Sequence, residues 1–232
     1  MGKNPQKVLG VLGGMGPAAS ARFLEILAEL SPAKSDQEHP KIFYISDPQI
    51  PDRTKAILEN GEDPSVQIKA DLFKLVECGS DILAVPCNTA HYFIENFVDE
   101  LPIPLVSIVE ASVKLARKVS PQGAWLLSTK ATWRSGLYSK HANRYGYNLY
   151  FPDDETREEV QRVIYLVKTN KIKEASIRLE DVLKKLWGER DIPFIAACTE
   201  LPLAYEASSL PQEKMISSLF ALAKSCIEEI YR

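Results

Sequence analysis

Short apolar runs alternate along the chain with longer segments whose apolar residues recur at helical spacing. The apolar runs lie at 7–13, 41–46, 81–86 and 104–108, then at 123–127, 148–151 and 193–197. The segments with helical spacing lie at 18–30, 63–77, 88–100 and 110–119, then at 133–145, 153–168, 171–186 and 211–231. Because strands that alternate with helices are typical of parallel sheets with crossover connections, the pattern predicts an α/β protein.

The order of elements repeats in the second half of the chain. An apolar run leads to a loop of small residues after Gly13 and again after Ser128. At a similar distance further on, a later run ends in Cys87 in the first half and in Cys198 in the second. Ligands of open parallel sheets gather at the carboxyl ends of the strands, where both cysteines fall. We therefore expect two similar halves, although two unrelated halves without a shared cleft would also fit.

Composition places the chain among ordinary globular proteins. Its 232 residues carry a net charge of −3, which gives no reason to expect a nucleic acid or a membrane as partner. No apolar run approaches the roughly 18 residues of a membrane span, and the first residues lack the apolar segment of a signal peptide. We expect a cytoplasmic enzyme with four reduced thiols.

Two of the four cysteines occur in a setting that favours chemistry. Cys87 follows an apolar run and precedes Asn88 and Thr89, and Cys198 similarly precedes Thr199. A thiol at the start of a helix is held preferentially as thiolate, which is what we expect at both positions. Cys78 and Cys226 instead lie within helical patterns, where packing is the expected role.

Other motifs leave alternatives open. The segment 14–19 matches the dinucleotide fingerprint G-x-G-x-x-A, but the acidic residue expected about 20 positions further on is missing, so binding of a small anion is favoured. Cys87 and His91 are four positions apart, a spacing that suits a Cys–His hydrolase or zinc with Cys198 as third ligand. A fourth ligand is lacking, so no metal is expected. Taken alone, Arg53 and Lys168 are typical surface charges.

Five motifs together resemble one known family. They are Leu12-Gly-Gly-Met-Gly-Pro17, Asp47-Pro-Gln-Ile-Pro-Asp-Arg53, Pro86-Cys-Asn-Thr-Ala-His91, Ser135-Gly-Leu-Tyr138 and Cys198-Thr-Glu200. In this order they resemble the aspartate/glutamate racemases, specifically the aspartate racemase branch that works without pyridoxal phosphate. The resemblance implies that each chain has two pseudo-symmetric α/β domains, with the active site in the cleft between them. It also implies that two such chains form a homodimer. The first domain would comprise 1–112 plus 210–232 and carry Cys87, and the second would comprise 113–209 and carry Cys198.

The same resemblance assigns roles to individual residues. Cys87 and Cys198 match the two catalytic cysteines. The matching pocket residues are Met15, Asn88, Thr89, Thr129, Thr132 and Thr199, and the basic residues associated with acidic substrates are Arg53 and Lys168. Ala131 and Ala197 stand where the family often has glycine, and their methyl groups could alter the pocket.

The predicted reaction is inversion of aspartate, or alternatively glutamate, at the α-carbon without a cofactor. One cysteine thiolate would remove the α-proton while the thiol of the other protonates the opposite face. A maleate isomerase, a hydantoin racemase and a non-catalytic small-anion-binding protein stay open as alternatives. Which cysteine acts on which enantiomer, and which basic residue binds the side-chain carboxylate, are left undecided.

Overall fold

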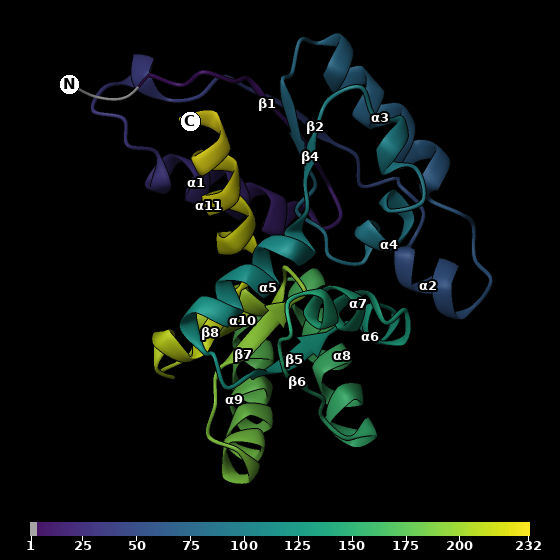
Figure 1. Ribbon diagram of the computed structural model, residues 1–232. Helices are drawn as coiled ribbons and strands as arrows, with labels where there is room; N and C mark the ends of the chain where they lie inside the picture. Colours follow the sequence, from purple (N-terminus) through teal and green to yellow (C-terminus); the bar gives the residue numbers. More distant parts are fainter. Residues whose placement is uncertain (1–3) are drawn as a thin grey trace. The chain divides into compact units, whose positions relative to one another are not determined.

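The computed structural model describes residues 4–232, which form two compact units (Figure 1). The first unit extends to Ile108 and includes Leu219–Arg232, and the second is Val109–Ser218. Each unit contains a four-stranded sheet in which every pair of neighbouring strands is parallel. The α/β class predicted from the hydrophobic pattern and the two-domain architecture implied by the family resemblance are confirmed. The boundaries differ from the expected ones, since the second unit begins at Val109 and ends at Ser218.

The sheet of the first unit has the strand order β2-β1-β3-β4. Its strands are β1 (Leu9–Gly13), β2 (Ile42–Ser46), β3 (Ile82–Ala84) and β4 (Leu105–Val106). Its helices are α1 (Pro17–Leu30), α2 (Arg53–Leu58), α3 (Ser65–Glu77), α4 (Ala90–Ile94) and the greater part of α11 (Ser218–Ile230).

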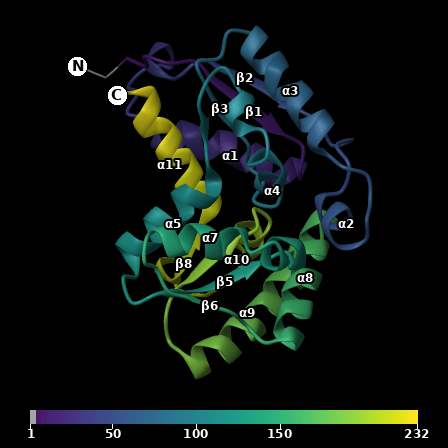
Figure 2. The same cartoon turned by 45° about the vertical axis from the view of Figure 1, so that its right-hand side comes forward.

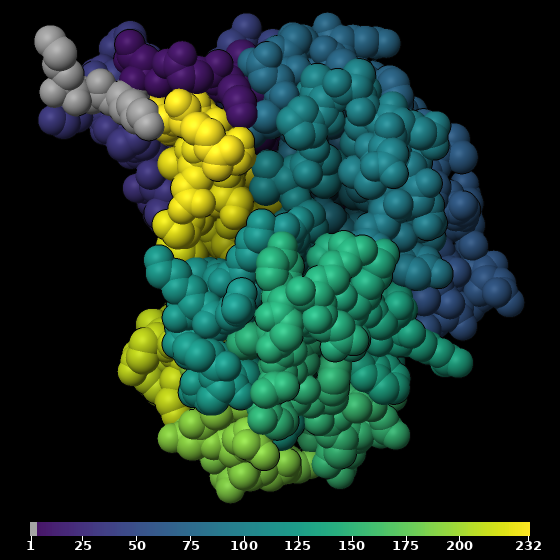
Figure 3. Space-filling view, in the orientation of Figure 1, coloured from purple at the N-terminus to yellow at the C-terminus, as the bar shows by residue number. Residues whose placement is uncertain are grey.

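Helices cover both faces of this first sheet. Helices α1 and α11 lie on one side of it, and α3 and α4 lie on the other (Figures 1 and 2). Leu12 of β1 and Leu72 of α3 belong to one buried cluster, which shows how the apolar face of the helix fills the core. The C-terminal helix lies against the N-terminal segment (yellow against purple in Figure 3), where the Gln6 N–H donates to the Ile230 carbonyl at 2.8 Å.

The sheet of the second unit has the order β6-β5-β7-β8. Its strands are β5 (Ala124–Ser128), β6 (Leu149–Tyr150), β7 (Phe194–Ala197) and β8 (Met215–Ser217). Helices α8 (Asp154–Lys168) and α9 (Ile172–Glu189) lie on one face, and α5 (Ile108–Val119) and α7 (Leu137–Arg144) lie on the other (Figures 1 and 2). Two shorter helices complete the unit, α6 (Lys130–Arg134) and α10 (Leu201–Glu206).

The two sheets share one topology. In each, the first strand along the chain occupies the second position, and the strand that leads to a cysteine lies directly beside it. The strand order reverses between these two neighbours, β1 and β3 in one sheet and β5 and β7 in the other. In open α/β sheets the crevice at such a reversal is where ligands bind. Cys87 and Cys198 therefore follow equivalent strands, at the carboxyl ends of the two sheets.

Three predicted helices are wrong in part. The helix predicted over 88–100 extends only from Ala90 to Ile94, because the backbone of Phe97 leaves the helical region. The helix predicted over 133–145 is split into α6 and α7 by Gly136, whose φ of 68° is left-handed. Most of the segment 211–231 is helical, but Met215–Ser217 forms β8, since these residues pair with β7 at the sheet edge. Across residues 4–232 the structure contains no helix sufficiently long and apolar to cross a membrane.

Candidate active site

The loop after β1 is built around a close approach between backbones. Gly14 has a φ of 94°, and a Cβ atom there would lie 2.5 Å from the backbone of Asp47, so only glycine fits. The Gly14 N–H donates to the Ser20 hydroxyl of α1 at 3.1 Å. The next residue, Met15, is buried and belongs to the same apolar cluster as Cys87. The predicted pocket residue Met15 and the first cysteine thus lie in one packed region.

Cys87 lies in the loop between β3 and α4 rather than at the first turn of a helix. Its N–H donates to the Val85 carbonyl at 2.8 Å, and the helix begins only at Ala90. Cys87, Asn88 and Thr89 are buried, at 7%, 2% and 6% exposure. The two residues that follow Cys87 carry no charge, and α4 has only five residues, so a strong helix dipole does not act on the sulfur.

His91 is bound to backbone through both ring nitrogens. Its Nδ1 is 2.9 Å from the Cys87 carbonyl oxygen, and its Nε2 is 3.3 Å from the Ile108 N–H. Because the amide of Ile108 is a donor, Nε2 accepts and Nδ1 carries the proton that it donates to Cys87. The imidazole thus supports the Cys87 loop through the backbone groups of Cys87 and Ile108.

Arg53 is the first residue of the short helix α2. Asp52 caps this helix by accepting the N–H of Lys55 at 2.8 Å. The Arg53 Nη1 donates to the carbonyls of Ile50 and Pro51, at 2.8 and 2.9 Å, and the residue is only 9% exposed. Ile50 belongs to the buried cluster that contains Met15 and Cys87, so Arg53 is bound to a residue of that cluster. We call these five residues the first thiol site: Met15, Arg53, Cys87, Asn88 and Thr89.

Two threonines follow β5 in the second unit. Thr129 caps α6 by accepting the Thr132 N–H at 3.1 Å, and its hydroxyl donates to that of Thr132 at 3.0 Å. Both are buried. Ala131, between them, is fully buried, so its methyl group contributes to the packing of this turn.

Cys198 follows β7 and lies against a carboxylate. Its thiol donates to Glu200 Oε2 at 3.0 Å, and Thr199 donates to the same oxygen at 3.4 Å. Cys198, Thr199 and Glu200 are 5%, 2% and 4% exposed. We call these five residues the second thiol site: Thr129, Thr132, Lys168, Cys198 and Thr199.

The expected thiolate at Cys198 is wrong. Burial, followed by the charge of Glu200, raises the pKa of the Cys198 thiol well above its usual range. The charge of Lys168, at the end of α8, and a backbone N–H of Glu200 act in the opposite direction. The short helix α10 begins only at Leu201, so its dipole does not offset the cost of burying a negative sulfur.

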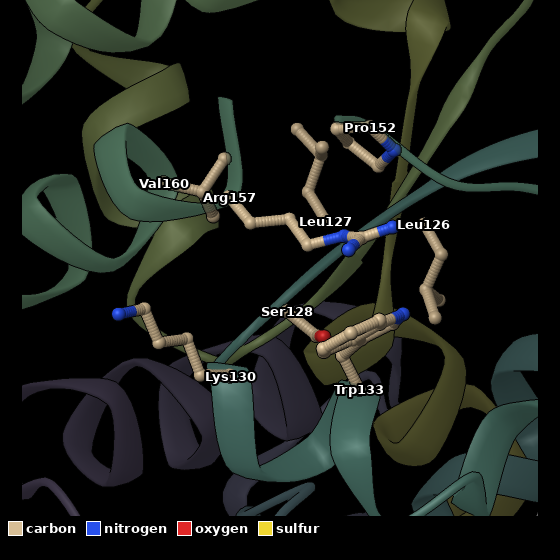
Figure 4. Close-up of a pocket in the computed structure, with 8 residues that line it drawn as sticks. All are labelled: Leu126, Leu127, Ser128, Lys130, Trp133, Pro152, Arg157 and Val160. Atoms are coloured by element: carbon tan, nitrogen blue, oxygen red, sulfur yellow. The ribbon is translucent and has the colours of Figure 1, made fainter. Parts of the chain in front are cut away.

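A small cavity lies beside β5, apart from the groups that surround Cys198. It is lined by Leu126, Leu127, Ser128, Lys130, Trp133, Pro152, Arg157 and Val160 (Figure 4). The Arg157 guanidinium lies over the Trp133 ring, 3.8 Å from its centre. The cavity has a volume of about 10 Å³, which admits about one water molecule, so it is too small for an amino acid.

Cys226 is buried as expected, but Cys78 is exposed at the end of α3, so the packing role predicted for it is wrong. All four cysteines are free thiols. Within residues 4–232, the structure brings together no group of three or more His, Cys, Asp or Glu side chains that could hold a metal ion.

Comparison with known proteins identifies the family. Residues 12–226 match the family described as Asp/Glu/Hydantoin racemase. The chain belongs to this family. It is 27% identical to the broad specificity amino-acid racemase RacX of Bacillus subtilis (strain 168), over 95% of this chain and 96% of that protein.

Solved structures agree with the family match. The structure resembles Picrophilus torridus aspartate racemase with a TM-score of 0.85 and 32% identity, covering 97% of this chain and 94% of that one. An aspartate racemase homologue from Pyrococcus horikoshii OT3 shares the fold, with a TM-score of 0.77 and 24% identity over 98% of this chain and all of that one. Family and relatives together indicate an amino-acid racemase, and the predicted family is confirmed.

Glu200 has no role in the site predicted from the sequence, although it is part of the Cys-Thr-Glu motif. Its position two residues after a buried cysteine does not show that its carboxylate turns back onto the sulfur. The corresponding residue after Cys87 is Thr89, which bears no charge. A comparison of the two thiol sites residue by residue would have identified Glu200 as the difference.

Proposed function

We propose that the protein racemises an acidic amino acid, aspartate or glutamate, without a cofactor, using Cys87 and Cys198 as its two acid–base groups. The main support is the repeated topology, which delivers one buried thiol to the reversal point of each sheet. Membership of the racemase family and the likeness to an aspartate racemase support the same reaction class.

In this proposal the two thiols act on opposite faces of one α-carbon. One sulfur begins as thiolate and takes the α-proton, and the S–H of the other delivers a proton to the opposite face. Two separate groups are needed because a single base would return the proton to the side from which it came. The carbanion character that develops next to the α-carboxylate is stabilised by hydrogen-bond donors of both sites, including the Asn88 amide and the hydroxyls of Thr89 and Thr199.

The acidic side chain of the substrate would be bound by the two basic residues. Arg53 uses Nη1 for the carbonyls of its own loop, and its guanidinium has further donors with which to meet a carboxylate. Lys168 already acts electrostatically on Cys198, so its charge lies within range of the second thiol site. This division of tasks favours a dicarboxylic amino acid over a neutral one.

Broader specificity is the second candidate. It is favoured by the full-length similarity to an amino-acid racemase whose name describes broad specificity. Circular dichroism of L-aspartate, L-glutamate and L-alanine, incubated separately with the enzyme, distinguishes the two. The proposal expects decay of the signal for an acidic substrate and a rate at least about tenfold lower for alanine, the cost of one lost charged contact. Equal decay for all three would favour broad specificity, and no decay for any would contradict racemisation.

The homodimer, the cytoplasmic location and the independence from cofactors stay predictions. Light scattering on a size-exclusion column tests the dimer. Full activity after dialysis against a chelator, with no change on adding pyridoxal phosphate, is the expected result for an enzyme that relies on its thiols alone.

A further inference from the structure

Glu200 is a buried carboxyl group with one oxygen in use and one not. Its Oε2 accepts the Cys198 thiol at 3.0 Å and the Thr199 hydroxyl at 3.4 Å. Its Oε1 is buried and has no hydrogen-bond partner among the described residues. Burying such an oxygen without a partner costs about 1–3 kcal/mol, so the position calls for an explanation other than stability.

Two ionisable groups act on the Cys198 sulfur, and a third is acted on by it. Glu200 lies in the loop after β7 and Lys168 ends α8. The hydroxyl of Tyr138, on α7 at the other face of the sheet, has its pKa raised in part by Cys198. Tyr138 is buried, which raises the pKa of its hydroxyl and keeps it neutral. The balance at the sulfur is therefore between the negative charge of Glu200 and the positive charge of Lys168.

We propose that Glu200 is a positioning residue that keeps Cys198 as a thiol in the free enzyme, so that Cys198 rests as the acid and Cys87 as the base. The inference rests on the two-thiol racemisation proposed above. It stands on the thiol–carboxylate hydrogen bond and on the absence of a carboxylate at the equivalent position, Thr89. The high pKa of the Cys198 thiol agrees with it.

The protons balance over one catalytic cycle. In the resting form, the Cys87 thiolate takes the α-proton of one enantiomer as the Cα–H bond breaks, and the Cys198 S–H bond breaks to form the new Cα–H bond. The enzyme is left with Cys87 as thiol and Cys198 as thiolate. It returns to the resting form when Cys87 releases its proton to water and Cys198 takes one up.

Unequal stability of the two enzyme forms has a kinetic signature. The resting form binds one enantiomer productively, and the rarer form binds the other, so the second enantiomer has the higher KM and the higher kcat. Enantiomers have equal free energies in water, so kcat/KM must nevertheless be equal in the two directions at every pH. This equality is an internal check on the data.

The test compares wild type with Glu200→Gln, and Glu200→Asp is the conservative variant. The matched control is Glu206→Gln, which removes an exposed carboxylate at the end of α10. In Glu200→Gln we expect the KM values of the two enantiomers to approach each other by about tenfold, the effect of one pKa unit. The alkaline limb of kcat/KM should also move to lower pH, because Cys198 loses its proton more readily. Glu200→Asp should lie in between, and Glu206→Gln should match wild type.

A purely structural role for Glu200 predicts a different result. Glu200→Gln would then be folded, as checked by circular dichroism, but would lose activity equally at all pH values, with the KM ratio and the alkaline limb unchanged. That outcome overturns the proposal.

A measurement on the wild-type enzyme keeps the proposal testable if Glu200→Gln does not fold. Alkylation by iodoacetamide across a pH series, read by mass spectrometry, should modify Cys87 at lower pH than Cys198. The reverse order overturns the proposal. The alkylation order does not depend on the substrate, so it separates a failure of this inference from a failure of the proposed racemisation.

Discussion

Cys87 and Cys198 follow equivalent strands of two sheets with the same topology, yet the groups around the two sulfurs differ. Cys87 is followed by the neutral residues Asn88 and Thr89, and its loop is supported by a backbone-bound His91. Cys198 is hydrogen-bonded to the buried carboxylate of Glu200 and lies within reach of the charge of Lys168. Duplication of the fold thus repeats the positions of the thiols but not their electrostatics, so the proposed inversion of a stereogenic α-carbon would run on an asymmetric pair of thiols.

The largest effect is expected from removing either sulfur. Cys87→Ser and Cys198→Ser should each lower racemisation by at least about 10²–10⁴-fold, the usual contribution of one acid–base group, because serine is far harder to deprotonate. The loss of circular dichroism from the preferred substrate measures the rate. Cys78→Ser, at the exposed cysteine, is the matched control and should racemise normally. Racemisation at the wild-type rate in either active-site variant would disprove the two-thiol scheme.

The two basic residues come next. Arg53→Ala and Lys168→Ala should each raise KM for the acidic substrate by about tenfold to a hundredfold, the value of one charged hydrogen bond. Lys168→Ala should also move the alkaline limb of kcat/KM to higher pH, because the charge that lowers the pKa of Cys198 is gone. Arg53→Ala should leave that limb in place. Steady-state kinetics across pH measure both effects, and a shift of the limb in Arg53→Ala would contradict the assignment of Lys168 alone to the second thiol site.

The sequence predicted the skeleton of these sites better than their electrostatics. Apolar runs that end in cysteine located both thiols, because burial of strands is encoded in local hydrophobicity. The break at Gly136 and the strand at Met215–Ser217 were missed, since one depends on a single left-handed residue and the other on pairing with a distant strand. The interaction of Glu200 with Cys198 was missed because it depends on a side-chain orientation that composition and spacing do not determine.

A smaller effect is expected at His91. In His91→Asn the amide nitrogen can replace Nδ1 and donate to the Cys87 carbonyl, while the contact with Ile108 is lost. We expect destabilisation of about 0.5–1.5 kcal/mol for the loss of one buried hydrogen bond, and activity within about tenfold of wild type. Thermal unfolding and steady-state kinetics check this. If kcat falls by more than about 10²-fold and the acidic limb of the kcat/KM profile disappears, His91 is an acid–base group instead.

The smallest effect concerns stability away from the thiols. Hydrogen bonds from Lys114, and then from Tyr145, lower the pKa of Glu110 in the folded protein below its usual 4.5. A carboxyl group whose pKa is lower in the folded state stabilises the fold above its unfolded pKa, and this contribution is lost as the pH falls through the folded value. Glu110→Gln should therefore be less stable than wild type at pH 7 and closer to it in acid. Urea unfolding at both pH values measures the difference. In the control Glu62→Gln, at an exposed position, the difference in unfolding free energy from wild type should not shrink in acid. If Glu110→Gln is less stable than wild type by the same amount at both pH values, the stabilising role of the Glu110 carboxylate is contradicted.

The most direct test of the two-thiol account is exchange of the α-proton in deuterium oxide, followed by NMR on each enantiomer separately. Each single-cysteine variant keeps one base on one face, so Cys198→Ser should exchange the α-proton of one enantiomer and Cys87→Ser that of the other, both without inversion. Exchange of the same enantiomer in both variants would contradict the assignment of the thiols to opposite faces.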